Sequence, residues 1–278
     1  MNSFDINRFG KALRWVISVN FRSSLMWALG LMLGVFLGEM MILGIFRSTE
    51  PVGTHTGSLA AFFVVYINIG VVVGICNLFV ELDKKPNRQA FLMLPATNLE
   101  KFLAATIFST VCGFLTMHLS FIVGDTLRVA FRALFYGESW NSFVFTELIE
   151  HMKFDGIAAY HTLGYRVAGW AFLVCGLTWL HSFYTLGGTL FRKYAFVISS
   201  IVLVAGITAF VWFKRHHGGS MFYTYYTADV MEEGVGAMTY VLTAFFAVFS
   251  VVNYWFSFRI FKGFELITNK WMNYDFYK

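Results

Sequence analysis

The chain alternates between long apolar stretches and short polar segments. Six of the stretches reach the length of about 20 residues that a helix needs to cross the hydrocarbon core of a membrane. These stretches cover residues 25–46, 58–80, 102–123, 167–190, 194–213 and 236–260. The pattern predicts an all-α integral membrane protein with six transmembrane helices, forming a single transmembrane domain over residues 1–278.

The 21 lysines and arginines are distributed unevenly over the polar segments. Most of them precede the first stretch, separate the second from the third, fill the turn after the fourth, or follow the sixth. Basic residues collect in the cytoplasmic segments of membrane proteins. We therefore expect both termini in the cytoplasm, and residues 124–166 and 214–235 as external loops. Apolar residues in the first of these loops indicate two interfacial helices, linked around Gly137 and Trp140.

Residues 4–22, which precede the first stretch, have a helical pattern of their own. Arg8, Lys11, Arg14 and Arg22 recur at helical spacing, and apolar residues occupy a different side. This pattern predicts an amphipathic helix that rests its basic face on membrane lipid. The same face also suits contact with a protein partner.

The polar segment between the second and third stretches carries signals for a short helix. Pro86 suits a first helical turn, and Pro95 disfavours the helical conformation in the residue before it. Thr97 and Glu100 have the spacing of a capping box, in which each side chain accepts the backbone N–H of the other residue. We expect a short helix, a proline break and a restart into the third span. Such a helix suits mechanical contact with a soluble partner, or is a well-capped helix without one.

Glycines recur every fourth residue in the first two stretches: Gly30, Gly34, Gly38, Gly70 and Gly74. Small residues at this spacing let transmembrane helices approach closely. We therefore expect these glycines to make helix–helix contacts, either within one subunit or between two copies.

Glu39 is an acidic residue within the first stretch, about 21 Å from its cytoplasmic end at 1.5 Å per residue. A carboxylate at that depth is costly and is expected to face the bundle interior or a wet cavity. Three interpretations stay open: a translocation-path or gating residue, a structural hydrogen bond, or an outward position near the outer interface.

Composition and motifs give no support for catalysis. The chain is 58% hydrophobic and 13% charged, whereas soluble domains are about half apolar and a quarter charged. Its three cysteines form no CxxC pattern, and the one Gly-Lys pair, Gly10-Lys11, lacks the upstream glycine of a phosphate-binding loop. We expect no enzymatic activity of its own, no cofactor and no nucleic-acid partner.

Histidines raise two further hypotheses. His216 and His217 are adjacent, but no third ligand has a recognisable spacing, so we predict no metal site. His118 and His181 suggest a haem held between two spans. Their depths differ by roughly 10 Å at 1.5 Å per residue, which disfavours two level axial ligands.

Two segments resemble a known family. They read NRFGKALRW near the N-terminus and LPATNLEKFL after the second stretch. With the six-span topology, they resemble the membrane subunit (permease) of ABC transporters of the type-2 exporter class, in particular small six-span permeases of Bacteroidetes-type bacteria. Many members carry Leu-Pro-x-Ser/Thr followed by a lysine, which correspond here to Leu94-Pro95-Ala96-Thr97 and Lys101.

The resemblance implies a function and partners. The chain would lie in the bacterial inner membrane, work with a second permease copy of the same or a different kind, and export a substrate by alternating access. The short helix would couple it to a separate ATPase subunit. The residues implied in that coupling are Lys84, Arg88, Pro95, Thr97, Glu100 and Lys101. The alternatives are a membrane scaffold without transport and a membrane-embedded redox or haem subunit.

Overall fold

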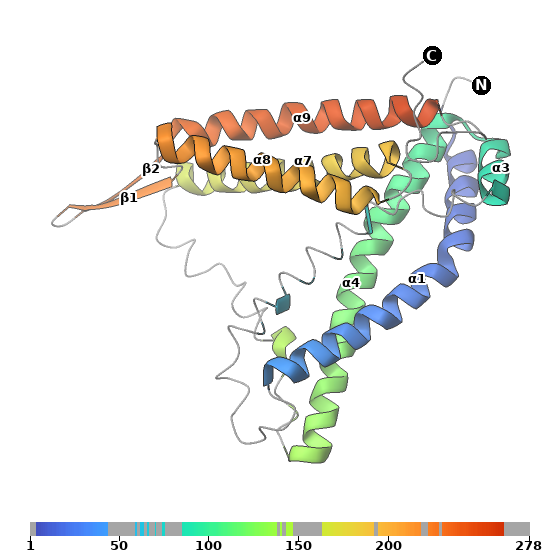
Figure 1. Ribbon diagram of the computed structural model, residues 1–278, viewed down its shortest axis with the longest axis horizontal. Helices are drawn as coiled ribbons and strands as arrows, with labels where there is room; N and C mark the ends of the chain where they lie inside the picture. Colours follow the sequence, from blue (N-terminus) through green and yellow to red (C-terminus); the bar gives the residue numbers. More distant parts are fainter. Residues whose placement is uncertain are drawn as a thin grey trace. The chain divides into compact units, whose positions relative to one another are not determined.

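The computed structural model describes residues 4–43, 59, 62–63, 66, 70, 74–75, 85–137, 140, 143–146, 163–191, 194–217, 222–227 and 230–263. The helices are α1 (Ile6–Leu43), α3 (Lys85–Met93), α4 (Asn98–Tyr136), α7 (Leu163–Leu190), α8 (Ala195–His217) and α9 (Ala237–Lys262) (Figure 1). The strands are β1 (Phe222–Thr227) and β2 (Val230–Val235). All of these helices except α3 are long and apolar enough to cross a membrane. The described chain is that of a helical, multi-pass membrane protein.

Five of the six predicted spans correspond to these long helices. The stretches 25–46, 102–123, 167–190, 194–213 and 236–260 fall on α1, α4, α7, α8 and α9. The stretch 58–80 lies outside the described residues, apart from a few single positions. The count of six spans and the orientation of the termini stay predictions.

Two helices are longer than the apolar pattern indicated. From Ile6 onward the segment 4–22 is part of α1 and not a separate helix, since no proline interrupts the chain before the apolar stretch. Asp5 caps α1 by accepting the backbone N–H groups of Asn7 and Arg8 at 2.7 and 3.3 Å.

Helix α4 continues past Gly124, where we expected an external loop. Its 39 residues span about 58 Å at 1.5 Å per residue, roughly twice the hydrocarbon thickness. It ends at Gly137, whose φ of +68° closes the helix in the left-handed conformation that glycine adopts readily. The first expected interfacial helix is therefore an extension of α4. Of the second, only residues 144–146 are described, and they are helical.

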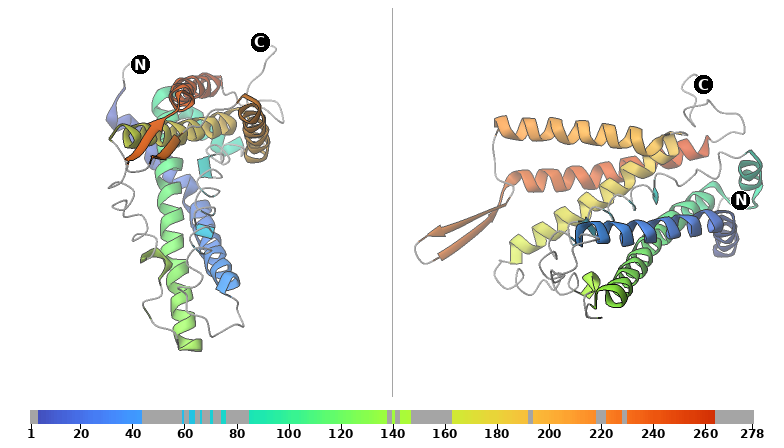
Figure 2. Two further views of the ribbon diagram at one scale, coloured as in Figure 1. Left: turned by 90° about the vertical axis from the view of Figure 1, so that its left-hand side faces the viewer. Right: turned by 60° about the horizontal axis from the view of Figure 1, so that its bottom comes forward.

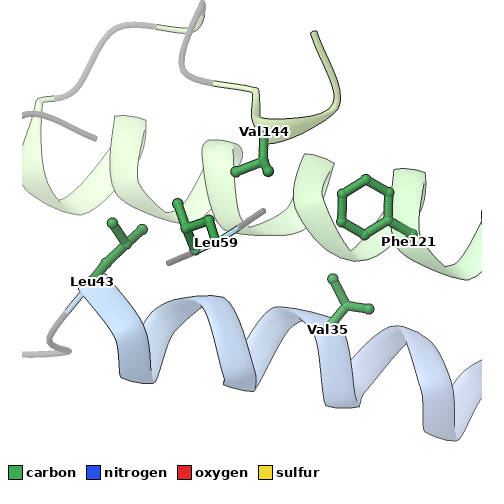
Figure 3. Packing of buried hydrophobic residues seen from close by; sticks show 5 residues of the cluster. All are labelled: Val35, Leu43, Leu59, Phe121 and Val144. Atoms are coloured by element: carbon green, nitrogen blue, oxygen red, sulfur yellow. The ribbon is translucent and has the colours of Figure 1, made fainter. Parts of the chain in front are cut away.

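The chain forms two compact units. The first comprises Met1–Gly74 and Leu103–Phe154, and in it α1 packs against α4. Ser120 Oγ on α4 donates to the Ala28 carbonyl on α1 at 3.1 Å. An apolar cluster fills the contact between them (Figure 3): Val35, Leu43, Leu59, Phe121 and Val144.

The second unit comprises Ile75–Phe102 and Asp155–Lys278. Helix α7 contacts both α9 and α8 in it (Figures 1 and 2). Polar side chains join α7 to α9: Asn253 Nδ2 donates to Ser182 Oγ at 3.2 Å, and His181 Nδ1 lies 2.6 Å from the Tyr254 hydroxyl. Such hydrogen bonds are a usual means of joining helices within a membrane.

A β-hairpin connects α8 to α9 and projects beyond their ends (Figure 2). Strands β1 and β2 pair antiparallel, from Phe222 opposite Val235 to Thr227 opposite Val230. We expected an external loop over residues 214–235, without strands. The aromatic and β-branched residues of the segment FYTYYT account for the strand, since such residues are enriched in strands.

Candidate functional site

The predicted short helix is present as α3, and its connection to α4 has the expected form. Helix α3 ends at Met93, the chain bends through residues 94–96, and α4 begins at Asn98. The Thr97 N–H donates to Glu100 Oε2 at 2.8 Å, and the Glu100 N–H donates to Thr97 Oγ1 at 3.2 Å. The capping box is therefore confirmed. It fixes the direction in which α4 begins.

The Lys101 side chain also bridges the bend between α3 and α4. Its Nζ donates to the Leu92 carbonyl at 2.7 Å, at the C-terminal end of α3. A cation at this end satisfies a carbonyl without a helical partner and complements the helix dipole. Because Lys101 belongs to the first turns of α4, its side chain ties the end of α3 to the start of α4.

The capping box predicts a measurable loss of stability. We expect Thr97→Ala to lower the free energy of unfolding by about 1 kcal/mol, because the Glu100 N–H loses its acceptor. Thr126→Ala on the same helix is the control, since the exposed Thr126 hydroxyl donates to the Ile122 carbonyl of its own helix. Thermal unfolding of both variants in detergent measures the difference. Equal melting of both variants would contradict the prediction.

One side of α3 is buried against the end of α9. The Phe91 side chain is buried, and its ring lies 6.1 Å from that of Phe261 in an edge-on arrangement. Phe102, at the start of α4, lies 5.6 Å from Phe258 and 5.5 Å from Phe261, measured between ring centroids. We call these four rings the aromatic joint. All four belong to the second unit.

The charged residues expected to face a partner lie inside instead. Arg88 is only 4% exposed, and Glu100 and Lys101 are buried as well. Arg88 stands three residues before Phe91, so both fall on the side of α3 that faces the protein. Thr97 is half-buried, Pro95 is exposed and Lys84 lies outside the described residues. The outer face of α3 consists of other side chains: Pro86, Gln89, Ala90 and Met93.

Glu39 belongs to a buried charge cluster in the first unit. Its side chain is 1% exposed, and Oε2 accepts a hydrogen bond from Arg128 Nε at 3.0 Å. Arg128, which is fully buried, also donates from Nη2 to Asp125 Oδ1 at 2.6 Å. The second oxygen of Asp125 accepts the backbone N–H of Phe145 at 3.2 Å. One arginine thus joins two helices, and Asp125 fastens the segment 143–146 to α4.

A second arginine lies on the same side of α4. Arg132 is buried, one turn beyond Arg128, and its guanidinium lies 5.4 Å from the centroid of the Tyr136 ring. Such a cation–π contact favours the buried charge. Of these residues, Glu39 was predicted from the sequence, whereas Asp125 and the two arginines were not. Their spacing on one helical face, at steps of three and four, was the available signal.

The ion pair bears on the three interpretations of Glu39. Burial and the contact with Arg128 agree with the structural one. Glu39 Oε1 has no hydrogen-bond partner among the described residues. A role in the translocation path stays a prediction.

The predicted packing glycines divide into two groups. A Cβ at Gly38 would meet Phe62, one at Gly70 would meet Met117, and one at Gly74 would lie 4.0 Å from the Gly113 Cα. At Gly30 and Gly34, no atom of the described chain lies within 4 Å of an added Cβ. The first group therefore lies in contacts within the unit, and the second does not.

The histidines of the haem and metal hypotheses make local contacts. His118 Nδ1 lies 2.8 Å from the Phe114 carbonyl, and His216 Nδ1 lies 2.9 Å from the Trp212 carbonyl. His181 contacts Tyr254, as described for the α7–α9 contact. In the part of the chain that the structure describes, no three His, Cys, Asp or Glu side chains are placed to hold a metal ion.

Comparison of the chain with protein-family models, with curated proteins and with solved structures finds no match. The structural features that bear on function are α3, the aromatic joint and the charge cluster.

Proposed function

We propose that this protein is the membrane permease of an ATP-driven exporter and that a separate, soluble ATPase subunit docks on α3. The observation that carries the proposal is the construction of α3. A connection between two membrane spans needs no fixed helix, yet this one is held at its end by Lys101 and packed on α9 through Phe91. A helix fixed in this way passes the movement of a bound protein on to the helices it packs against.

The outer face of α3 supports a protein contact. Met93 is 83% exposed at the end of the helix, next to the exposed Pro95. An exposed methionine offers a flexible, polarizable contact that adapts to a partner's surface. Arg88, Glu100 and Lys101 then act by holding α3 in place, and the contact itself falls to Met93, Gln89 and their neighbours.

Transport by this chain and ATP hydrolysis by a separate subunit are assigned from the motifs of the sequence. It has no phosphate-binding loop, so the energy for transport comes from nucleotide binding to the partner. Closure of two ATPase subunits displaces α3 and favours one of two arrangements of the spans. Two permease copies in a bacterial inner membrane, with α3 on the cytoplasmic side, complete the assembly.

The test is affinity purification of the tagged chain from its native membrane in mild detergent, after crosslinking. We expect recovery of an ATPase with a Walker motif, and we expect Met93→Glu to reduce its yield about tenfold, since a charge at the centre of a contact is poorly tolerated. Met93→Leu keeps the apolar surface and is the matched control.

Two results would count against this proposal, and they differ in meaning. Recovery of no ATPase with the wild-type chain would leave a membrane scaffold as the better description. Equal recovery with Met93→Glu and Met93→Leu would show that the ATPase docks elsewhere.

A further inference from the structure

We propose that the aromatic joint carries movement of α3 to α9 and from there to α7, so that Phe91 and Phe261 are positioning residues for coupling. This inference rests on the proposed function, because the movement is supplied by the docked ATPase. It goes beyond docking by naming the helices that respond.

The first step concerns the joint itself. Phe91, Phe102 and Phe261 are all buried, and they come from α3, α4 and α9. Rings from three elements pack on one another here, at centroid distances of 5.5 to 6.1 Å. Closely packed side chains shift together or separate, and separation would expose the rings. A displacement of α3 is therefore transmitted to the end of α9.

The second step concerns what holds α3 to the start of α4. The Lys101–Leu92 hydrogen bond and the capping box of Thr97 and Glu100 bridge the bend between the two helices. Since each contact is short and local, α3 and the first turns of α4 form one rigid element. The joint connects that element to a helix far along the chain.

The third step leads from α9 to α7. The Trp179 ring on α7 stacks on Phe246 of α9 at 5.0 Å between centroids. His181 and Ser182 of α7 make the hydrogen bonds to Tyr254 and Asn253 described above. On α9 these contacts lie at Phe246, Asn253 and Tyr254, on the N-terminal side of the joint. Helix α7 is thus fastened to α9 by side chains and moves with it.

The experiment uses the permease–ATPase complex and the native Cys175 on α7 as a reporter. Maleimide labelling of Cys175 is compared without nucleotide and with a non-hydrolysable ATP analogue. We expect the analogue to change the labelling rate in the wild-type complex. We expect Phe261→Ala to reduce that response about tenfold while the ATPase is still recovered.

Two further variants keep the test decisive. Phe256→Ala removes an exposed ring from the same helix and should leave the nucleotide response intact. Phe261→Leu preserves burial and serves if Phe261→Ala fails to assemble; it should weaken the response in the same direction.

A second arm examines the packing of the joint by crosslinking, which needs no ATPase, and then the effect of the crosslink on ATP hydrolysis by the complex. In a chain whose native cysteines are replaced by alanine, Phe91→Cys and Phe261→Cys should react with a short bifunctional thiol reagent. This chain has lost both rings, and the crosslink joins the two helices again. The crosslinked complex should therefore hydrolyse ATP at least as fast as the uncrosslinked one, because in the proposal the two helices move together.

Each outcome has a distinct meaning. If the ATPase is recovered and Phe261→Ala responds like the wild type, the joint does not transmit movement. If the crosslink inhibited ATP hydrolysis by the complex, α3 would have to move relative to α9, and the inference would be overturned too. Failure to recover any ATPase contradicts the proposed function and removes the basis of this inference, whereas crosslinking without nucleotide still reports the packing.

Discussion

Arg128→Gln is expected to destabilise the protein by about 3–5 kcal/mol, which is the cost of removing one partner from a buried ion pair. Arg128 is 0% exposed and donates to carboxylates on two sides, Glu39 and Asp125. Glutamine keeps a polar end but supplies no charge. The variant therefore leaves two buried carboxylates without this cation. Thermal unfolding in detergent, followed by size-exclusion chromatography, measures the loss.

Two controls isolate the charge cluster. Arg22→Gln changes an exposed arginine on α1 and should alter stability by less than about 0.5 kcal/mol. The double variant Glu39→Gln, Arg128→Gln removes one charge of each sign and should melt above the single Arg128→Gln variant, since coupled groups are not additive. Melting of Arg128→Gln at the wild-type temperature would show that the cluster does not form.

The charge cluster also positions residues 143–146, in addition to joining α1 and α4. Asp125 accepts the Phe145 N–H, and the neighbouring Val144 belongs to the apolar cluster with Val35 and Phe121. The same arginine that pairs with Glu39 therefore orients the carboxylate that fastens residues 143–146. Loss of Arg128 is expected to loosen this segment together with the α1–α4 contact.

The sequence predicted what depends on local chemistry. Long apolar stretches gave five of the helices, and the capping box was readable because Thr97 and Glu100 are three residues apart. The burial of Arg88 could not be predicted from the sequence, since the side of α3 that faces the protein is defined by a residue far away in the chain, Phe261, which packs on Phe91. From its charge alone, Arg88 was expected to be exposed.

The partners of Glu39 escaped prediction for a related reason. Asp125 and Arg128 follow Gly124, and the apolar pattern placed that region in an external loop. Helical continuation to Tyr136 puts both residues on one face of α4, where they meet α1. The apolar residues of this segment predicted a helix, but they lie on its exposed side and do not indicate that the polar side is buried.

Gly124 makes a close helix–helix contact that the spacing of glycines in the sequence did not predict. The packing glycines were predicted from their four-residue spacing, and Gly124 has no glycine at that spacing. It is nevertheless buried, and an added Cβ would lie 2.8 Å from the Met32 carbonyl oxygen and 2.8 Å from Val35 Cβ. The first of these is a backbone atom of α1, so rotation of a side chain cannot relieve the contact.

Gly124→Ala is therefore expected to destabilise the protein by about 1–3 kcal/mol, the usual cost of forcing extra carbon into a packed contact. Gly113→Ala is the control on the same helix, because no atom of the described residues lies within 4 Å of an added Cβ there. Alanine at that position should leave stability unchanged or raise it by up to about 1 kcal/mol, through its higher helix propensity. Melting temperatures of the two variants in one detergent give the comparison. If Gly124→Ala were as stable as Gly113→Ala, α1 would not approach α4 this closely, and the Glu39–Arg128 pair, which depends on the same approach, would have to be reconsidered as well.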